Sequence, residues 1–223
     1  MRGLQQRRRE RRSADDNRPS PREGQSEVIT QQQSYDGVSE ASRKDLTALV
    51  VELCERHFRL FPDDRFALIW YAMAKIKLAE YSQAEKAIRR SISLRKGDRR
   101  FLGIAFKEMG NLSDAKGDLR TSAAWYRRAL RANPKRNCYI YLGHIAFRRG
   151  LLKQAEAHYR KAIRDPSDCA DEACFNLGSV LVARRRYREA IRCYRKALKI
   201  DPEYGIAKKR LRDTELALQL KGS

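Results

Sequence analysis

One pattern of about 35 residues recurs along this chain and restricts its possible folds more than any other feature. Its clearest copy is residues 171–204, where Leu177 and Gly178 are followed by Ala190, Tyr194 and Pro202. Small residues suit the crossing of two antiparallel helices, larger ones fill the space between them, and proline ends the second helix. The pattern therefore predicts a pair of antiparallel helices.

Three further copies are predicted at residues 65–98, 103–136 and 136–170. One small position of the second helix recurs in all four copies, at Ser91, Ala129, Ala162 and Ala197. The steps between these positions are 38, 33 and 35 residues. The long first step leaves residues 99–102 over, which is about one additional helical turn at the front of the second copy. The first copy lacks the glycines and the proline.

These residues resemble the tetratricopeptide repeat family, whose unit of about 34 residues is a helix–turn–helix. The resemblance implies an all-α, right-handed α-solenoid of about four such units, in which each unit contacts only its neighbours. An array of this kind needs capping at both ends. We therefore predict an N-terminal capping helix at residues 43–61, a C-terminal capping helix at residues 205–220, about ten helices in all, and no sheet.

The array is predicted to occupy residues 42–221. Residues 1–41 contain few large apolar side chains, and burial cannot offset the entropy of ordering such a segment, so we predict a disordered tail. Ser42 and Asp45 have the spacing of a capping box, with Asp in place of Glu, and predict the start of the first helix.

Composition argues against several classes of protein. No apolar run approaches the roughly 18 residues of a membrane span, and the basic N-terminus is not followed by the apolar segment of a secretory signal. Five cysteines show neither disulfide-framework nor zinc-site spacing, which favours reduced thiols, no metal and a cytoplasmic location, with a nuclear one as alternative. The three histidines have no partner at catalytic spacing and no phosphate-binding loop is present, so we predict no enzymatic activity and no cofactor.

The resemblance also implies a concave groove, lined by the first helix of each unit, that binds peptides or partner helices. Carried over by position, the lining residues are Ile69, Met73, Lys77, Lys107, Asn111, Ile140, His144, Phe147, Arg148, Phe175, Ser179 and Val182. Apolar anchors flanked by charge suit an amphipathic or acidic protein partner. The alternative for the apolar members is that they pack against the next unit or against the capping helix.

Some family members grip a partner's C-terminal carboxylates with a clamp of five Lys, Asn and Arg residues. Lys107 and Asn111 match its first pair. Tyr141, Glu172 and Asn176 occupy the other three positions, and the carboxylate of Glu172 would repel such a ligand. The sequence therefore disfavours this function.

The formal net charge is +21, and residues 1–44 hold only ten basic against seven acidic residues, so most of the excess belongs to the array. In each copy, the second helix has a basic pair at the same position. Because equivalent positions of a solenoid stack on one another, we predict that these pairs form a ridge on its outer surface. The pairs are Arg89 and Arg90, Arg127 and Arg128, Arg160 and Lys161, and Arg195 and Lys196. The ridge is either a solvated face or a site for an anionic partner such as RNA, a membrane surface or an acidic protein segment.

Three functions follow from these observations. The first is a non-enzymatic scaffold or adaptor that binds a peptide or helix of a protein partner in the groove. The second is an RNA-associated protein that contacts the phosphate backbone through the ridge in a salt-sensitive way. The third is an assembly factor that docks a larger complex through its end helices.

Overall fold

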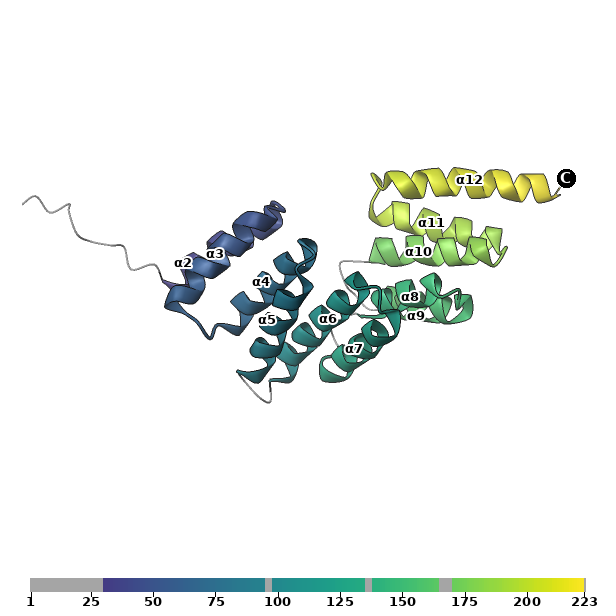
Figure 1. Ribbon diagram of the computed structural model, residues 1–223. Coiled ribbons are helices and arrows are strands. Elements are labelled where there is room, and N and C mark those ends of the chain that lie inside the picture. Colours follow the sequence, from purple (N-terminus) through teal and green to yellow (C-terminus); the bar gives the residue numbers. More distant parts are fainter. Residues whose placement is uncertain (1–29, 95–97, 135–137, 165–169, 223) are drawn as a thin grey trace, which may run out of the picture.

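A computed structural model describes residues 30–94, 98–134, 138–164 and 170–222. Within these ranges the chain forms eleven helices and no strand (Figure 1), which confirms the predicted all-α class. The helices are α2 (Gln31–Arg43), α3 (Thr47–Leu60), α4 (Arg65–Lys77), α5 (Tyr81–Ser93), α6 (Arg99–Ala115), α7 (Leu119–Ala132), α8 (Tyr139–Arg148), α9 (Leu152–Arg164), α10 (Ala170–Ala183), α11 (Tyr187–Ile200) and α12 (Gly205–Gly222).

Eight of these helices form four successive two-helix units: α4–α5, α6–α7, α8–α9 and α10–α11, numbered 1 to 4 below. The two helices of each unit pack side by side, and the second helix packs on the first helix of the next unit. First helices also touch between units, as α4 does with α6 and α8 with α10. The array therefore curves toward its first helices, and we call their surface the inner face. The outer face is formed by α5, α7, α9 and α11.

Small residues at the helix crossings hold each unit together. Gly178 lies against the ring of Tyr194, and a Cβ added to this glycine would come within 2.6 Å of a ring atom. The same pairing recurs as Gly110 with Tyr126 and Gly143 with Tyr159. These tyrosines are at most 1% exposed, so the close approach buries a large ring. In unit 1, Ala72 stands in the place of the glycine and Ile88 in the place of the tyrosine, and both side chains are fully buried.

The turn inside each unit has a residue in the left-handed backbone region. Gly117 and Gly150 occupy this position in units 2 and 3, with φ of 81° and 71°. Ala79 and Arg185 occupy it in units 1 and 4, with φ of 59° and 58°. Glycine adopts this conformation freely, whereas a side chain with a Cβ is strained by it.

The N-terminal end departs from the prediction. The predicted disordered tail, residues 1–41, is wrong for residues 31–41, which belong to α2. Thr30 and Gln33 form a capping box at its start, and Val38 and Ala41 are buried against the following helices. The polar composition of this segment concealed an amphipathic helix, because a few well-placed side chains are enough to dock it on α3. Residues 1–29 lie outside the described ranges.

The predicted capping box at Ser42 and Asp45 is also wrong. Helix α2 runs through Arg43, and α3 begins at Thr47, after Leu46, whose side chain makes no cap hydrogen bond. Asp45 instead lies in the turn between them with a φ of 55°.

Two other boundaries agree with the sequence. Helix α6 begins at Arg99, as the additional turn predicted, and α12 occupies the predicted C-terminal capping position and packs on α11. Among the helices of the described ranges, none combines the length and the hydropathy needed to cross a bilayer.

Candidate partner-binding surfaces

Two of the predicted groove residues do not reach the surface. Ile69 and Ile140 are 4% and 3% exposed, and each packs inside an apolar cluster. The prediction is therefore wrong for these two isoleucines, since their side chains fill the seams between helices. These two side chains pack against neighbouring helices, as the alternative interpretation of the apolar groove residues states.

The inner face of unit 1 is partly covered by the α2–α3 hairpin. Met73 is half-buried and lines a cavity of about 30 Å³ together with Val50 and Trp70. Lys77 is exposed, and its Nζ lies 2.5 Å from a carboxylate oxygen of Asp45 in the turn between α2 and α3. This end of the inner face is thus already in contact with the chain itself.

Lys107 and Asn111 of unit 2 are engaged by a buried carboxylate. Glu108 is 2% exposed; Lys107 Nζ lies 3.2 Å from its Oε1, and Asn111 Nδ2 donates to its Oε2 over 2.7 Å. Asn111 Oδ1 in turn accepts a hydrogen bond from the hydroxyl of Tyr126 over 2.7 Å. Both residues therefore serve a local polar network, which supports the rejection of the carboxylate clamp.

The inner face of unit 3 presents an exposed aromatic ring beside polar groups. Phe147 is 40% exposed, and the neighbouring Arg148 forms an ion pair with Asp114 of α6. His144 Nε2 lies 3.0 Å from Asn176 Nδ2, across the junction to unit 4. Burial lowers the pKa of His144 below its ordinary value of 6.5, against the opposing effects of Glu172 and Asp114. The imidazole is therefore neutral at pH 7 and accepts the amide hydrogen bond.

The inner face of unit 4 continues this surface. Phe175, Ser179 and Val182 are all half-buried on α10. The Phe175 ring lies 5.7 Å from the ring of Tyr194 and 5.1 Å from that of Tyr204, measured between centroids. Packing of this kind fixes the direction of the phenylalanine while one side of it stays accessible.

On the outer face, all eight residues of the predicted ridge are exposed. Most of them contact other side chains of the chain. Four arginines form ion pairs, namely Arg89 with Glu85, Arg90 with Asp63, Arg160 with Glu156 and Arg195 with Glu215. Arg128 lies over the ring of Trp125 and Lys161 over that of Tyr139. Six of the eight cations therefore already have a partner within the chain.

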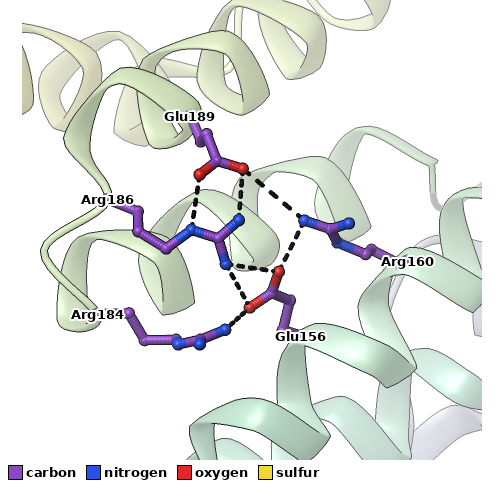
Figure 2. Close-up of polar contacts among 5 residues, drawn as sticks. All are labelled: Glu156, Arg160, Arg184, Arg186 and Glu189. Carbon is purple, nitrogen blue, oxygen red and sulfur yellow. Dashed lines mark hydrogen bonds and ion pairs between the residues drawn. The ribbon is translucent and has the colours of Figure 1, made fainter.

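A buried carboxylate between units 3 and 4 was missed by the sequence analysis. Figure 2 shows Glu156 of α9 enclosed by Arg160, Arg184 and Arg186. Arg186 also pairs with Glu189 of α11, with a shortest separation of 2.5 Å, and this contact lowers the pKa of Glu189. The cluster ties α9 to the turn of unit 4. The run of three arginines at residues 184–186 was visible in the sequence, but the distant carboxylate was not.

A second missed cluster joins α2, α3 and α4. His57 is 1% exposed; its Nδ1 lies 2.9 Å from Ser34 Oγ and its Nε2 lies 3.3 Å from a carboxylate oxygen of Asp64. Asp64 also accepts hydrogen bonds from the backbone N–H groups of Phe66 and Ala67, and so caps α4. The cluster therefore has a structural use, to fasten the N-terminal hairpin to unit 1. Across the described residues, no three His, Cys, Asp or Glu side chains are placed to hold a metal ion.

Comparison with known proteins identifies the same repeat family as the sequence pattern. Two tetratricopeptide repeat family models match the chain, one over residues 102–168 and one over residues 171–204. Anaphase-promoting complex subunit 3 of Schizosaccharomyces pombe is 28% identical over 131 residues, which cover 58% of this chain. The match spans only 19% of that relative's length.

Solved structures agree on the fold. The APC/C hetero-tetramer Cut9-Hcn1 contains a chain that superposes with a TM-score of 0.71 at 15% identity, over 84% of this chain and 37% of that one. A thermophilic tetratricopeptide repeat protein of Thermus thermophilus superposes with a TM-score of 0.64 at 21% identity, over 84% of this chain and all of the other.

Proposed function

Because this chain belongs to the tetratricopeptide repeat family, we propose that it is a non-enzymatic scaffold for protein–protein interaction. The relative in Schizosaccharomyces pombe is named as a subunit of a multi-protein complex, which fits a scaffold. Since the matched region is a small part of that relative, the partner of this chain is argued from its own surface.

The proposed binding surface is the inner face of units 3 and 4. The observation that carries this proposal is the exposed ring of Phe147 beside half-buried Phe175, with polar groups at His144 and Arg148. Aromatic anchors surrounded by hydrogen-bonding and charged groups are typical of interfaces that bind a peptide or a helix. An amphipathic helix or an extended segment with apolar side chains at regular spacing would fit this surface.

Affinity purification with quantitative mass spectrometry tests the proposal. A chain carrying Phe147→Glu and Val182→Glu should recover the specific partners at least tenfold less well, because a buried apolar contact is replaced by a charge. Leu216→Glu, a matched change at an exposed position of α12, should leave recovery unchanged. Equal recovery by all three chains would contradict binding at the inner face.

The second candidate is binding to RNA through the ridge. It is favoured by the exposure of all eight basic side chains, and weakened by the six contacts described above. Retention on immobilised RNA should fall steeply with salt, and changing all eight residues to Ser should lower the retention and flatten its dependence on salt. Retention that is insensitive to salt, or equal in the variant, would remove this candidate.

A further inference from the structure

The outer face forms grooves beside the second helices, between α9 and α11 in unit 4 and between α3 and α5 in unit 1, and one pair of repeat positions lines each of them. One member of the pair lies on the first helix and the other on the second helix of a unit. Both members step by the same 38, 33 and 35 residues as the small position of the repeat. The four pairs are Leu68 with Ala87, Phe106 with Trp125, Tyr139 with His158, and Cys174 with Cys193.

Aromatic rings occupy this pair of positions in the two central units. The rings of Phe106 and Trp125 lie 5.6 Å apart, measured between centroids, and those of Tyr139 and His158 lie 6.2 Å apart. A basic side chain covers each pair, since Arg128 lies 4.7 Å from the Trp125 ring and Lys161 lies 5.3 Å from the Tyr139 ring. The chain thus fills these two grooves with its own side chains.

Smaller residues occupy the same positions in units 1 and 4, and each of these units has a cavity there. In unit 4, Cys174 and Cys193 border a cavity of about 320 Å³. In unit 1, Leu68 and Ala87 border one of about 380 Å³. At both ends of the array, a cavity thus coincides with smaller residues at this repeat position.

The floor of the unit 4 cavity is apolar. Ile163 of α9 and Leu177 and Leu181 of α10 line it beside the two cysteines. Burial raises the pKa of the Cys193 thiol to about 11 and also raises that of Cys174. Both thiols therefore stay protonated at pH 7 and act as part of the apolar surface.

The rim of the same cavity is strongly basic. Four cationic side chains line it, from Arg160, Arg164, Arg192 and Lys196. Its one carboxylate, Glu189, is held by Arg186. Within the described part of the chain, no carboxylate lies within 4 Å of Arg164, Arg192 or Lys196. The unit 1 cavity differs, because Arg90 at its rim is paired with Asp63 and Glu55 also lines it.

We propose that the unit 4 cavity is a docking site for an acidic protein segment, which inserts one large apolar side chain beside Cys174 and Cys193. Unit 2 indicates the size of the side chain that would fit, because Trp125 fills the equivalent space there from within the chain. Arg164, Arg192 and Lys196, which form no ion pair with the residues that the structure describes, supply the charge complementarity for Asp and Glu residues on either side of the anchor. An apolar floor offers nothing to a phosphate backbone, which argues for a protein segment over RNA.

This site is separate from the surface proposed above for the scaffold function. It lies on the outer face and uses α9, α10 and α11, whereas Phe147 and Val182 belong to the inner face. A partner could therefore engage both faces at once, or two partners could bind together. Substitutions on one face test that face alone.

Binding of a synthetic peptide by fluorescence anisotropy tests the proposal on the full-length chain. The probe is a labelled peptide in which glutamates flank a single tryptophan. We expect saturable binding that weakens with salt, and binding about tenfold or more weaker for a peptide with alanine in place of the tryptophan. Equal affinity for the alanine peptide would overturn the proposal, because it would leave only a general attraction of charges.

Two variants separate the floor from the rim. Cys193→Trp places in unit 4 the residue that fills the groove of unit 2, and should weaken binding about tenfold or more. Arg192→Glu reverses an exposed rim charge and should weaken it about tenfold. Lys199→Glu, the same change at an exposed position of α11 outside the cavity, should leave affinity within about twofold.

Circular dichroism verifies that the variants fold, and Arg192→Glu keeps the test valid even if the tryptophan disturbs packing. Unchanged affinity in Arg192→Glu would overturn the proposal. Displacement of the peptide by single-stranded RNA at lower concentration than by unlabelled peptide would also overturn it, in favour of a nucleic-acid site.

Discussion

The two ends of the array are closed in different ways. At the N-terminal end, the hairpin of α2 and α3 is fastened by a buried polar cluster in which His57 and Asp64 are 1% and 8% exposed. At the C-terminal end, the single helix α12 buries Ala207 and Thr214 and leaves Leu216 and Leu220 exposed. The first end depends on specific hydrogen bonds, and the second on the close approach of small residues.

This difference affects which part of the inner face is accessible. The N-terminal hairpin contacts the inner face of unit 1 at Met73 and Lys77. At the other end, α12 packs on α11, and Phe147 on the inner face of unit 3 remains exposed. The comparison therefore favours a partner on the C-terminal half of the inner face.

The largest expected effect is that of Asp64→Ala. This change removes the N-cap of α4, with its hydrogen bonds from Phe66 and Ala67, and leaves His57 buried without its carboxylate partner. We expect a loss of about 2–4 kcal/mol in the opening free energy of α2, α3 and α4. Hydrogen exchange with mass spectrometry measures this helix by helix, which suits a repeat array better than one global transition.

Asp98→Ala is the matched control for that change. Asp98 caps α6 with a hydrogen bond from the backbone of Phe101 and pairs with Arg65, but it is not part of a buried cluster. We expect a smaller loss than for Asp64→Ala, because the change removes a cap hydrogen bond and a partly exposed ion pair and leaves no buried group without its partner. Equal effects at the two caps would contradict the special role of the N-terminal cluster.

The next prediction compares the loss of stability when an apolar side chain is truncated at each end of the array. Val38 of α2 is 1% exposed, whereas Leu216 of α12 is 56% exposed. Val38→Ala should destabilise the N-terminal end by about 2 kcal/mol, because it removes buried methyl groups and leaves a cavity. Leu216→Ala should change stability by less than about 0.5 kcal/mol. Denaturant titration followed by circular dichroism measures both, and the reverse ranking would contradict the burial described here.

Acid should open the N-terminal end before the C-terminal one. Burial raises the pKa of Asp64, but hydrogen bonds from Tyr35, the Ala67 amide and Gln31 outweigh it, so the pKa falls below the ordinary 3.8. A carboxyl whose folded pKa is depressed contributes stability above its unfolded pKa and loses it as the pH falls through the folded value.

The pH effect should therefore develop below about pH 4. It should be smaller than that of Asp64→Ala, because a protonated carboxyl can still accept a backbone hydrogen bond. Hydrogen exchange over a pH series should reveal earlier opening of α2–α4 than of α11–α12, and Asp64→Asn should abolish the difference. His57, Gln31 and Tyr35 also face Asp64, so a His57→Gln control is needed.

The smallest expected effect concerns the turns of the end units. Arg185→Gly should stabilise unit 4 by about 1 kcal/mol, because glycine adopts the left-handed backbone at this position without strain. Ala79→Gly should do the same for unit 1, and Gly150→Ala should destabilise unit 3 by a similar amount. Thermal unfolding measures all three, and a destabilising Arg185→Gly would contradict the strain assigned to this turn.

The repeat seams were the most predictable part of this fold. The need for a small residue opposite a large ring is local, so Gly178 and Tyr194 reveal it at a fixed spacing in the sequence. The same local logic fails for residues whose surroundings come from elsewhere in the chain. Ile69 and Ile140 were assigned to the groove by position, and their burial depends on helices packed over them.

The polar composition of α2 conceals this helix, although the pattern at its start marks it. Thr30 and Gln33 have the spacing of a capping box, a signal that could have marked the start of this helix. The clusters around Glu156 and His57 were not predictable, since each joins side chains about 30 or 23 residues apart through tertiary packing. The pair of cysteines in unit 4 could have been found by aligning the repeats, and the cavity between them required the structure.

Site-specific photo-crosslinking in cells tests the central claim most directly. A photoreactive amino acid is placed at Phe147, on the exposed part of the inner face, and in a second chain at Lys77, where the N-terminal hairpin contacts that face. We expect crosslinks to a protein partner from position 147 and few or none from position 77. Crosslinks to the partner from position 77 and none from position 147 would contradict it.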